Sequence, residues 1–358
     1  MYSQAKRVWM ITDIHFGVRS NAQEWMDIQR DYFFNFFIPL AKSKYQPGDV
    51  LLILGDVFDN RQSIAIKAMH LALDVFEELA NIFDNIIVFA GNHDVWSKSS
   101  NDINSLRPLT KIKGVTLYIE PEVIMLGKRS FLIMPWRKDH EAERECLLQY
   151  KDKAEYLACH CDINGLKFNK NVTVDDGCAI SEYAGFKKVY SGHIHFSQDV
   201  ANIKMLGSPY QMTRSDAYNK KGVTILNLET EKELYFENTY SPQFIRINLN
   251  DIIQMTPAQA KRICRNNMVD IVIDSETALR APTGLLIELL DNVCRRIELQ
   301  VVSKSQELPD IDIQTGSGFN LDSLMEAYVK EMPYEDDTKK KLYDSLKKLH
   351  QLAEQRTK

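Results

Sequence analysis

Five short apolar segments of this chain each end in a cluster of aspartate, histidine or asparagine, and this pattern constrains the fold most. The five clusters are Asp13-x-His15, Gly55-Asp56-x-x-Asp59, Gly91-Asn92-His93-Asp94, His160 and Gly192-His193-x-His195. In α/β sheets, ligands bind at the carboxyl ends of strands, where loops converge from a rigid scaffold. We therefore expect one edge of the fold to gather residues that lie far apart in the sequence.

The apolar segments of residues 1–242 are separated by longer amphipathic stretches, which is typical of a layered α/β fold. Helices are expected near 24–44 and at 64–83, where apolar side chains recur at helical spacing. Strands are expected at 8–12, 50–54, 86–90, 116–119, 130–134, 156–159 and 188–191. The sequence thus predicts a first domain in which a sheet is buried between helices.

The pattern changes after Ser241-Pro242, where a second and smaller domain is expected over residues 243–303. Its predicted strands at 244–249, 270–273 and 298–302 alternate with helices at 256–265 and 283–295. Thr256 is placed to cap the first of these helices, with Pro257 at its first position. This order indicates a compact β-α-β-α-β unit.

The last part of the chain is expected to hold a linker and a pair of helices. Residues 304–319 combine Ser, Pro, Asp, Gly and Thr, as linkers do, and helices are expected near 320–331 and 338–355. The final helix carries an apolar stripe of Leu342, Leu346, Leu349 and Ala353. That stripe either receives a partner or packs on the core.

Composition argues against several classes of protein. No apolar run approaches the ~20 residues that span a bilayer, and no secretory signal is visible at the N-terminus. Six cysteines are scattered without the rhythm of a disulfide scaffold, so we expect reduced thiols and a cytoplasmic protein without membrane contact. A net charge of −5 argues against a surface coated for nucleic-acid binding, although it leaves room for a local basic groove.

The five clusters supply the donor atoms that hard divalent cations accept, namely carboxylate oxygen, amide oxygen and imidazole nitrogen. Asp56 follows a glycine turn and could bridge two ions with its two oxygens. The candidate metal ligands are Asp13, His15, Asp56, Asn92, His160, His193 and His195. Two ions about 3.5–4 Å apart can clamp a phosphate and activate a bridging water.

Each cluster taken alone has a simpler explanation. An Asp-x-His pair arises by chance, Gly-Asp-x-x-Asp suits a solvated turn, and a lone histidine after a strand is more often structural. All five clusters in order, each at a strand end, favour metal binding. The sequence therefore predicts a two-metal phosphoesterase.

A phosphoesterase also needs a group that protonates the leaving oxygen. His93 directly follows Asn92 and is the candidate general acid, or a stabiliser of the transition state. Asp59 is expected to orient His93 through its carboxylate, as carboxylate partners fix the tautomer of an imidazole. The alternative is that His93 only supports the metal ligands.

The order of the clusters, DxH, GDxxD, GNHD, H and GHxH, resembles the calcineurin-like metallophosphoesterase superfamily over residues 8–240. The resemblance implies a four-layer α-β-β-α sandwich around two Mn²⁺ ions, with Mg²⁺ or other divalent ions as alternatives. It also implies two ligand sets, which share one aspartate. One set is Asp13, His15, Asp56 and His195, and the other is Asp56, Asn92, His160 and His193.

The surroundings of the clusters are similar to one branch of that superfamily. Its protein phosphatases carry Arg-Gly after GDxxD and Glu after GNH, whereas this chain has Asn60-Arg61 and Asp94. A phosphoesterase domain followed by a small α/β capping domain and a C-terminal helical pair is similar to meiotic-recombination and SbcD-type DNA repair nucleases. The compact length and the run 207–222, with a short strand expected at 207–210, look most like the recombination endonuclease subunits of tailed phages.

This resemblance implies a Mn²⁺-dependent DNA exonuclease and endonuclease that acts in DNA end processing, recombination and double-strand-break repair. It also implies a homodimer within a heterotetramer, in which residues 320–358 dock on a coiled-coil ABC-type ATPase in the host cytoplasm. One departure is Cys161-Asp162 after His160, where relatives often have His-Gln or His-Gly. The alternatives are a phosphoesterase acting on nucleotides or phosphoproteins, and a structural subunit that tethers DNA ends.

Candidate DNA contacts lie on the loop that follows the last cluster. Arg214, Lys220 and Lys221 could reach backbone phosphates, and Tyr210 or Tyr218 could stack on bases. A solvated charged loop is an equally good interpretation of the same residues.

Overall fold

The computed structural model describes residues 2–274, 283–302, 329, 339–345 and 347. The chain divides into two units, Met1–Asp310 and Ile311–Lys358. The predicted linker at 304–319 lies outside the described residues, and so do most of the predicted helical pair and part of its apolar stripe. Within the second unit, residues 339–345 are helical.

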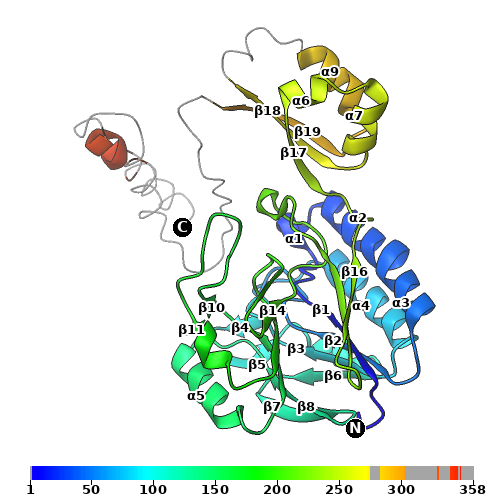
Figure 1. Ribbon diagram of the computed structural model, residues 1–358, viewed down its shortest axis with the longest axis vertical. Helices are drawn as coiled ribbons and strands as arrows, with labels where there is room; N and C mark the ends of the chain where they lie inside the picture. The colour runs from blue at the N-terminus through cyan, green and yellow to red at the C-terminus, as the bar shows by residue number, and fades with distance from the viewer. Residues whose placement is uncertain (1, 275–282, 303–328, 330–338, 346, 348–358) are drawn as a thin grey trace. The chain divides into compact units, whose positions relative to one another are not determined.

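The first unit is built on two six-stranded sheets (Figure 1). In spatial order, the first sheet contains β16 (Glu233–Glu237), β15 (Gly222–Asn227), β1 (Arg7–Ile11), β2 (Asp49–Ile53), β3 (Ile86–Phe89) and β6 (Val115–Tyr118). The second contains β13 (Gln198–Val200), β14 (Ile203–Met205), β12 (Lys188–Gly192), β9 (Tyr156–His160), β8 (Arg129–Met134) and β7 (Glu122–Leu126). The central strands of each sheet are parallel, so their carboxyl ends point the same way.

Alternation along the strands separates the hydrophobic core into layers. In β1, Val8 and Met10 lie in a core that also holds Phe131 and Ala158 of the second sheet. The intervening Trp9 belongs to a different core, which packs against helices. Successive side chains of a strand point to opposite faces, so one short apolar strand is buried on both sides.

Helices cover the outer face of each sheet, as Figure 1 shows. The first sheet is covered by α2 (Gln23–Asp31), a π-helical turn (Tyr32–Phe37), α3 (Ile38–Lys44) and α4 (Ile66–Ala80). The second sheet is covered by α5 (His140–Tyr150). The predicted four-layer α-β-β-α sandwich is therefore confirmed.

Shorter elements connect these layers. They are α1 (Val18–Asn21), the hairpin of β4 (Val95–Ser97) and β5 (Ser100–Asn104), the two-stranded pair β10 (Ile163–Asn164) and β11 (Cys178–Ala179), and 3₁₀ turns at Arg107–Lys111, Ile180–Tyr183 and Arg214–Asp216. The strand expected at 207–210 is absent, because the chain turns at Gly207 with φ +71° and continues into Pro209. No helix among the described residues is long and apolar enough to cross a membrane.

Residues 244–274 and 283–302 form a separate three-stranded parallel sheet with its own core. Its elements are β17 (Phe244–Asn248), α6 (Leu249–Ile253), α7 (Pro257–Cys264), β18 (Met268–Asp274), α9 (Thr283–Asp291) and β19 (Arg296–Val302). The Thr256 hydroxyl accepts a hydrogen bond from the Gln259 amide, as expected of the N-cap. The domain boundaries at 242/243 and 303/304 stay a prediction.

Candidate metal and active site

Loops from both sheets meet where their parallel strands end. β1, β2 and β3 lead into the first three clusters, and β9 and β12 of the other sheet lead into the last two. The two sheets are joined at this point, because the His193 amide donates to the Asp13 carboxylate at 3.1 Å. The structure therefore brings all seven predicted ligands together, across two sheets instead of along one.

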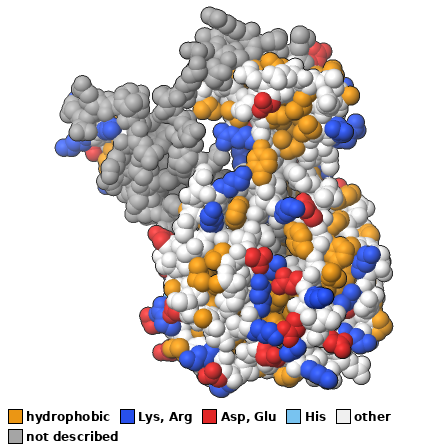
Figure 2. All heavy atoms as spheres, viewed as in Figure 1, with side chains coloured by type: hydrophobic (Ala, Val, Ile, Leu, Met, Phe, Trp, Pro, Cys, Tyr) orange, Lys and Arg blue, Asp and Glu red, His pale blue; other side chains and the backbone are white. Residues whose placement is uncertain are grey.

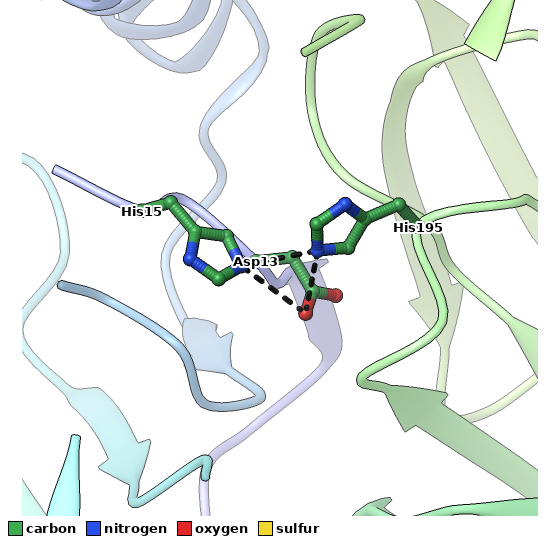
Figure 3. Close-up of side chains that lie close together, drawn as sticks. All are labelled: Asp13, His15 and His195. Carbon is green, nitrogen blue, oxygen red and sulfur yellow. Dashed lines mark hydrogen bonds and ion pairs between the residues drawn. The ribbon is translucent and has the colours of Figure 1, made fainter. Parts of the chain in front are cut away.

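A first group of three ligands consists of Asp13, His15 and His195 (Figure 3). The two Nε2 atoms of His15 and His195 lie 3.1 Å apart. The Asp13 carboxylate oxygen Oδ1 lies 3.9 Å from Nε2 of His15 and 3.8 Å from Nε2 of His195. Three donor atoms thus converge from two sheets on one point, as a metal ion requires.

A second group contains Asp56, His160 and His193, joined by Asn92. The Asn92 side-chain oxygen lies 2.8 Å from Nδ1 of His193 and 3.1 Å from Nε2 of His160. His160 is fixed from its other side, because its Nδ1 donates to the Leu54 carbonyl at 2.7 Å. This hydrogen bond occupies Nδ1, so Nε2 is the nitrogen of His160 whose electron pair could bind a cation.

Asp56 lies between the two groups, but it does so through one oxygen. Its Oδ2 is 3.5 Å from Nε2 of His15 and 3.3 Å from Nε2 of His160. Its Oδ1 instead accepts the backbone N–H of His93 at 2.8 Å. Oδ2 thus faces both groups and Oδ1 holds the loop of His93, and a bridge between two ions through both oxygens stays a prediction.

Three residues of the site have pKa values shifted in the direction that favours positive charge. Burial lowers the pKa of His15, but Asp59, Asp56 and Asp13 outweigh burial and raise it to about 9. Burial likewise opposes the charge on His160, and Asp56 outweighs it, which raises the pKa to about 10. Burial raises the pKa of Asp56, yet the adjacent imidazoles hold it well below its usual range. Cations would replace these protons, so the donor set fits divalent metal ions.

Four predicted ligands adopt a left-handed backbone, which non-glycine residues rarely do. The φ angles are +54° at Asp13, +51° at His15, +51° at Asp56 and +83° at His193. Such conformations cluster at functional sites, where the surrounding structure over-determines them. The backbone is therefore bent at these positions to aim the side chains inward.

Glycine precedes several ligands because the loops pass too close to one another for a side chain. A Cβ atom on Gly91 would lie 2.2 Å from Oδ1 of Asp56 and 2.4 Å from its backbone nitrogen. A Cβ atom on Gly192 would lie 2.8 Å from Nδ1 of His160. Both contacts are shorter than real atoms allow, so these glycines set the spacing of the ligands.

We expect Gly91→Ala to displace Asp56 and to weaken metal binding and stability together. A displaced buried carboxylate loses its hydrogen bonds, which costs about 1–3 kcal/mol of unfolding free energy. The matched control is Gly284→Ala, whose added Cβ meets nothing within 4 Å. Urea unfolding with chelator and calorimetric Mn²⁺ titration measure both effects. Equal behaviour of the two variants would contradict the close contact.

His93 faces the metal groups, and its partner differs from the predicted one. Its Nδ1 donates to the backbone carbonyl of Asp59 at 2.5 Å. The Asp59 carboxylate instead lies 3.4 Å from Nδ1 of His15, an ion-pair contact without hydrogen-bond geometry. The prediction that this carboxylate orients His93 is therefore wrong. The hydrogen bond to His93 is formed by the backbone carbonyl of Asp59, and the carboxylate lies beside His15.

Two supports of the site went unrecognised in the sequence. The buried carboxylate of Asp94 accepts backbone N–H groups of Val57, Phe58 and Gly91, which ties the second cluster to the third. Gln29 is fully buried and donates to the carbonyls of Ile14 and His15. Asp94 is part of a visible motif, but nothing in the sequence around Gln29 singles it out from other helical glutamines.

Tyr210 also supports the first cluster instead of facing solvent. Its ring is 1% exposed, and its hydroxyl donates to the carbonyl of Ile14. The suggestion that Tyr210 stacks on bases is therefore wrong. Tyr218, in contrast, is 65% exposed, and the Nζ of Lys170 lies 4.3 Å from its ring centre.

The three predicted DNA-contacting cations have partners within the chain. Arg214 pairs with Asp270 at 2.7 Å and also with Glu298. The buried Lys221 donates to Asp216 and to the carbonyl of His195, both at 2.6 Å. Lys220 is the exposed member, 3.0 Å from Glu237. The structure thus gives Arg214 and Lys221 supporting contacts, and DNA contact by the three residues stays a prediction.

We expect Lys221→Met to lower the unfolding free energy by about 3–5 kcal/mol, because Asp216 would be left as a buried, unpaired charge. Lys220→Met is the adjacent control, since its exposed ion pair is worth about 0–1 kcal/mol. Urea unfolding of both variants in chelator gives the comparison. A loss at Lys221 no larger than that at Lys220 would contradict the structural role.

Comparison with known proteins places this site in a family. The model of the family described as calcineurin-like phosphoesterase matches residues 6–273. The curated protein named Exonuclease subunit 1, from Enterobacteria phage T4, is 24% identical over 337 residues, which cover 91% of this chain and 93% of that protein.

Solved structures match more weakly. A structure described as a novel archaeal phosphodiesterase aligns with a TM-score of 0.34 and 12% identity, over 64% of this chain and 99% of that chain. A phosphopantetheinyl hydrolase of Mycobacterium tuberculosis aligns with a TM-score of 0.32 and 13% identity, over 58% of this chain and 92% of that chain. Matches at this level say nothing about substrate.

Proposed function

Because the chain belongs to the calcineurin-like phosphoesterase family, we propose that it is a Mn²⁺-dependent DNA nuclease that hydrolyses phosphodiester bonds. The observation that carries the metal-dependent chemistry is the convergence of Asp13, His15 and His195 with the Asp56 and Asn92 group. DNA as the substrate is supported by the phage relative, which is named an exonuclease subunit. We propose two Mn²⁺ ions, with Mg²⁺ or other divalent ions as alternatives.

The first ion would be held by Asp13, His15, Asp56 and His195, and the second by Asp56, Asn92, His160 and His193. When bound, the two cations would polarise the phosphate and lower the pKa of an attacking water. The chain's own residues supply the remaining chemistry. Loops from two sheets hold the donors in fixed positions, so little reorganisation is needed when a phosphodiester binds.

His93 is proposed as the general acid. A carbonyl can only accept, so the contact with Asp59 O requires a proton on Nδ1 of His93. The other ring nitrogen, Nε2, is then the atom that gains and loses the exchanging proton. His93 would donate this proton to the leaving oxygen of the phosphodiester as the bond breaks.

Contacts to DNA are proposed for the loop around Tyr218. A groove there includes Asn169, Lys170 and Tyr218 in its lining. An exposed aromatic ring beside a lysine suits a stacked base with a neighbouring phosphate. Figure 2 shows basic and acidic side chains interspersed on the displayed face. Lys220 would add a phosphate contact at the loop's exposed side.

The proposal extends to the biological setting. The nuclease would process DNA ends in recombination and double-strand-break repair, as a homodimer within a heterotetramer that contains a coiled-coil ATPase. Residues 320–358 would dock on that ATPase, and residues 243–303 would cap the nuclease domain. The name of the phage relative as a subunit supports an assembly with a partner.

The test is cleavage of end-labelled linear duplex DNA by the purified full chain in MnCl₂, MgCl₂ or EDTA. We expect shortening of the label-bearing strand with Mn²⁺ and none with EDTA, and His93→Ala serves as the inactive control. Absence of cleavage, with and without the ATPase partner, would contradict the nuclease. Rapid turnover of nucleotides or phosphopeptides in the same preparation would then support the alternative phosphoesterase.

A further inference from the structure

The carboxylate of Asp162 contacts the ring nitrogen of His193 that lies opposite the one facing the other candidate ligands. Its Oδ1 lies 2.6 Å from Nε2 of His193, while Nδ1 of the same ring lies 2.8 Å from the Asn92 oxygen. A carboxylate only accepts a hydrogen bond, so the proton of a neutral His193 lies on Nε2 and Nδ1 is left to bind a cation. The ring is thus fixed in both orientation and tautomer.

Charge makes this contact more than a structural detail. As metal ligands, Asn92, His160 and His193 would carry no charge, and Asp56 is shared with the other group. Asp162 brings a negative charge into direct contact with the second group, through the His193 ring. A carboxylate that accepts a hydrogen bond from the non-ligating nitrogen of an imidazole makes the imidazole a more basic metal ligand than a carbonyl in the same place does. His160, for comparison, has only the Leu54 carbonyl behind it.

The position of Asp162 is built into the local fold. It directly precedes β10, whose Ile163 pairs with Cys178 of β11. A Cβ atom on Gly177 would lie 2.0 Å from the Asp162 carbonyl oxygen, and Gly177 has a φ of +90°. The returning strand therefore passes against Asp162 at a glycine. This contact holds the segment that presents the carboxylate to His193.

We propose that Asp162 is a positioning residue for the second metal group, where it orients His193 and supplies the negative charge that tightens one of the two ions. The inference rests on the proposed two-metal function, since it concerns the affinity of one of those ions. It makes the two groups unequal. Among the described contacts, the side chains of Asp13, His15 and His195 form no hydrogen bond or ion pair with Asp162, so we expect their ion to be unaffected by changes there.

The test is calorimetric titration of Mn²⁺ into the chelator-stripped full chain, with Asp162→Asn compared with the unchanged protein. We expect Asp162→Asn to weaken one ion by about 10–100-fold and to leave the other unchanged. At a Mn²⁺ level that fills only the tighter group of the variant, electron paramagnetic resonance should change from a spin-coupled pair to an isolated ion. Asp176→Asn is the matched control, because Asp176 lies nearby in the segment between β10 and β11, is exposed, and contacts His140 at 3.3 Å instead of a ligand.

The outcomes separate this inference from the proposed function. If the unchanged protein binds fewer than two ions, the two-metal function fails. If it binds two ions and Asp162→Asn binds both with the same affinities, the role of Asp162 is overturned. A variant that loses both ions equally and unfolds at a lower temperature in chelator would also overturn it, because Asp162 would then stabilise the fold as a whole. Loss of one ion at an unchanged unfolding temperature supports it.

Discussion

His93→Ala should lower the rate of phosphodiester cleavage by about 10²–10⁴-fold while both metal ions remain bound, as expected for loss of a general acid. The side chain of His93 contacts the Asp59 carbonyl and packs edge-on against the ring of His15, with 4.9 Å between the ring centres, and its backbone N–H donates to Asp56. Alanine keeps that N–H, so the position of Asp56 should be preserved. The substitution thus removes the proton donor and leaves the metal ligands in place.

Cleavage rates at saturating Mn²⁺ and metal content after gel filtration are the two measurements. His70→Ala is a suitable control, because the His70 side chain is 77% exposed on α4 and contacts only Asp74. A variant that lost metal in proportion to activity would show that His93 supports the ligands. That result would favour the alternative in which His93 only supports the metal ligands.

Asp56→Ala should remove both ions and reduce cleavage to the level seen in EDTA. Oδ2 of Asp56 lies between His15 and His160, so its loss takes a carboxylate from each group at once. The substitution also removes the acceptor for the His93 N–H. We expect this to be the most damaging single change at the site, because one Asp56 oxygen lies within 3.5 Å of a histidine ligand in each group.

The measurement is the Mn²⁺ content of the purified variant by elemental analysis, followed by activity at increasing Mn²⁺. Asp74→Ala is the control, since its carboxylate forms only a partly exposed ion pair with Arg30 at 3.7 Å, besides its contact with His70. Two ions retained in Asp56→Ala would contradict the shared position. Retention of a single ion would assign Asp56 to one group only.

The sequence predicted the layers of the first domain because its central strands are short, apolar and buried on both faces. Val50–Leu54, for example, alternates between the core that separates the sheets and the core under the helices. Edge strands such as β7 and β16 went unpredicted, since their exposed residues interrupt the apolar run. The division of the ligands between two sheets was also not visible, because sequence order does not reveal which strands pair.

The sequence predicted which residues gather at the site better than it predicted the contacts between them. Asp59 was assigned to His93 on sequence proximity to Asp56, and the fold instead gives its carbonyl to His93 and its carboxylate to His15. Asp162 was noted only as a departure from related sequences. Its contact with His193 depends on the pairing of two distant loops, which no local pattern encodes.

Because the candidate ligands come from both sheets, bound cations would act as cross-links in the fold as well as in catalysis. The junction beside Asp13 and His193 is otherwise held by a few backbone and imidazole contacts. Any ligand that binds only the folded chain stabilises it, by about 2.7 kcal/mol at a concentration 100-fold above its dissociation constant. Metal binding would therefore couple the mutual orientation of the two sheets to the concentration of metal ions, and loss of the ions would weaken the contact between the sheets at the candidate active site.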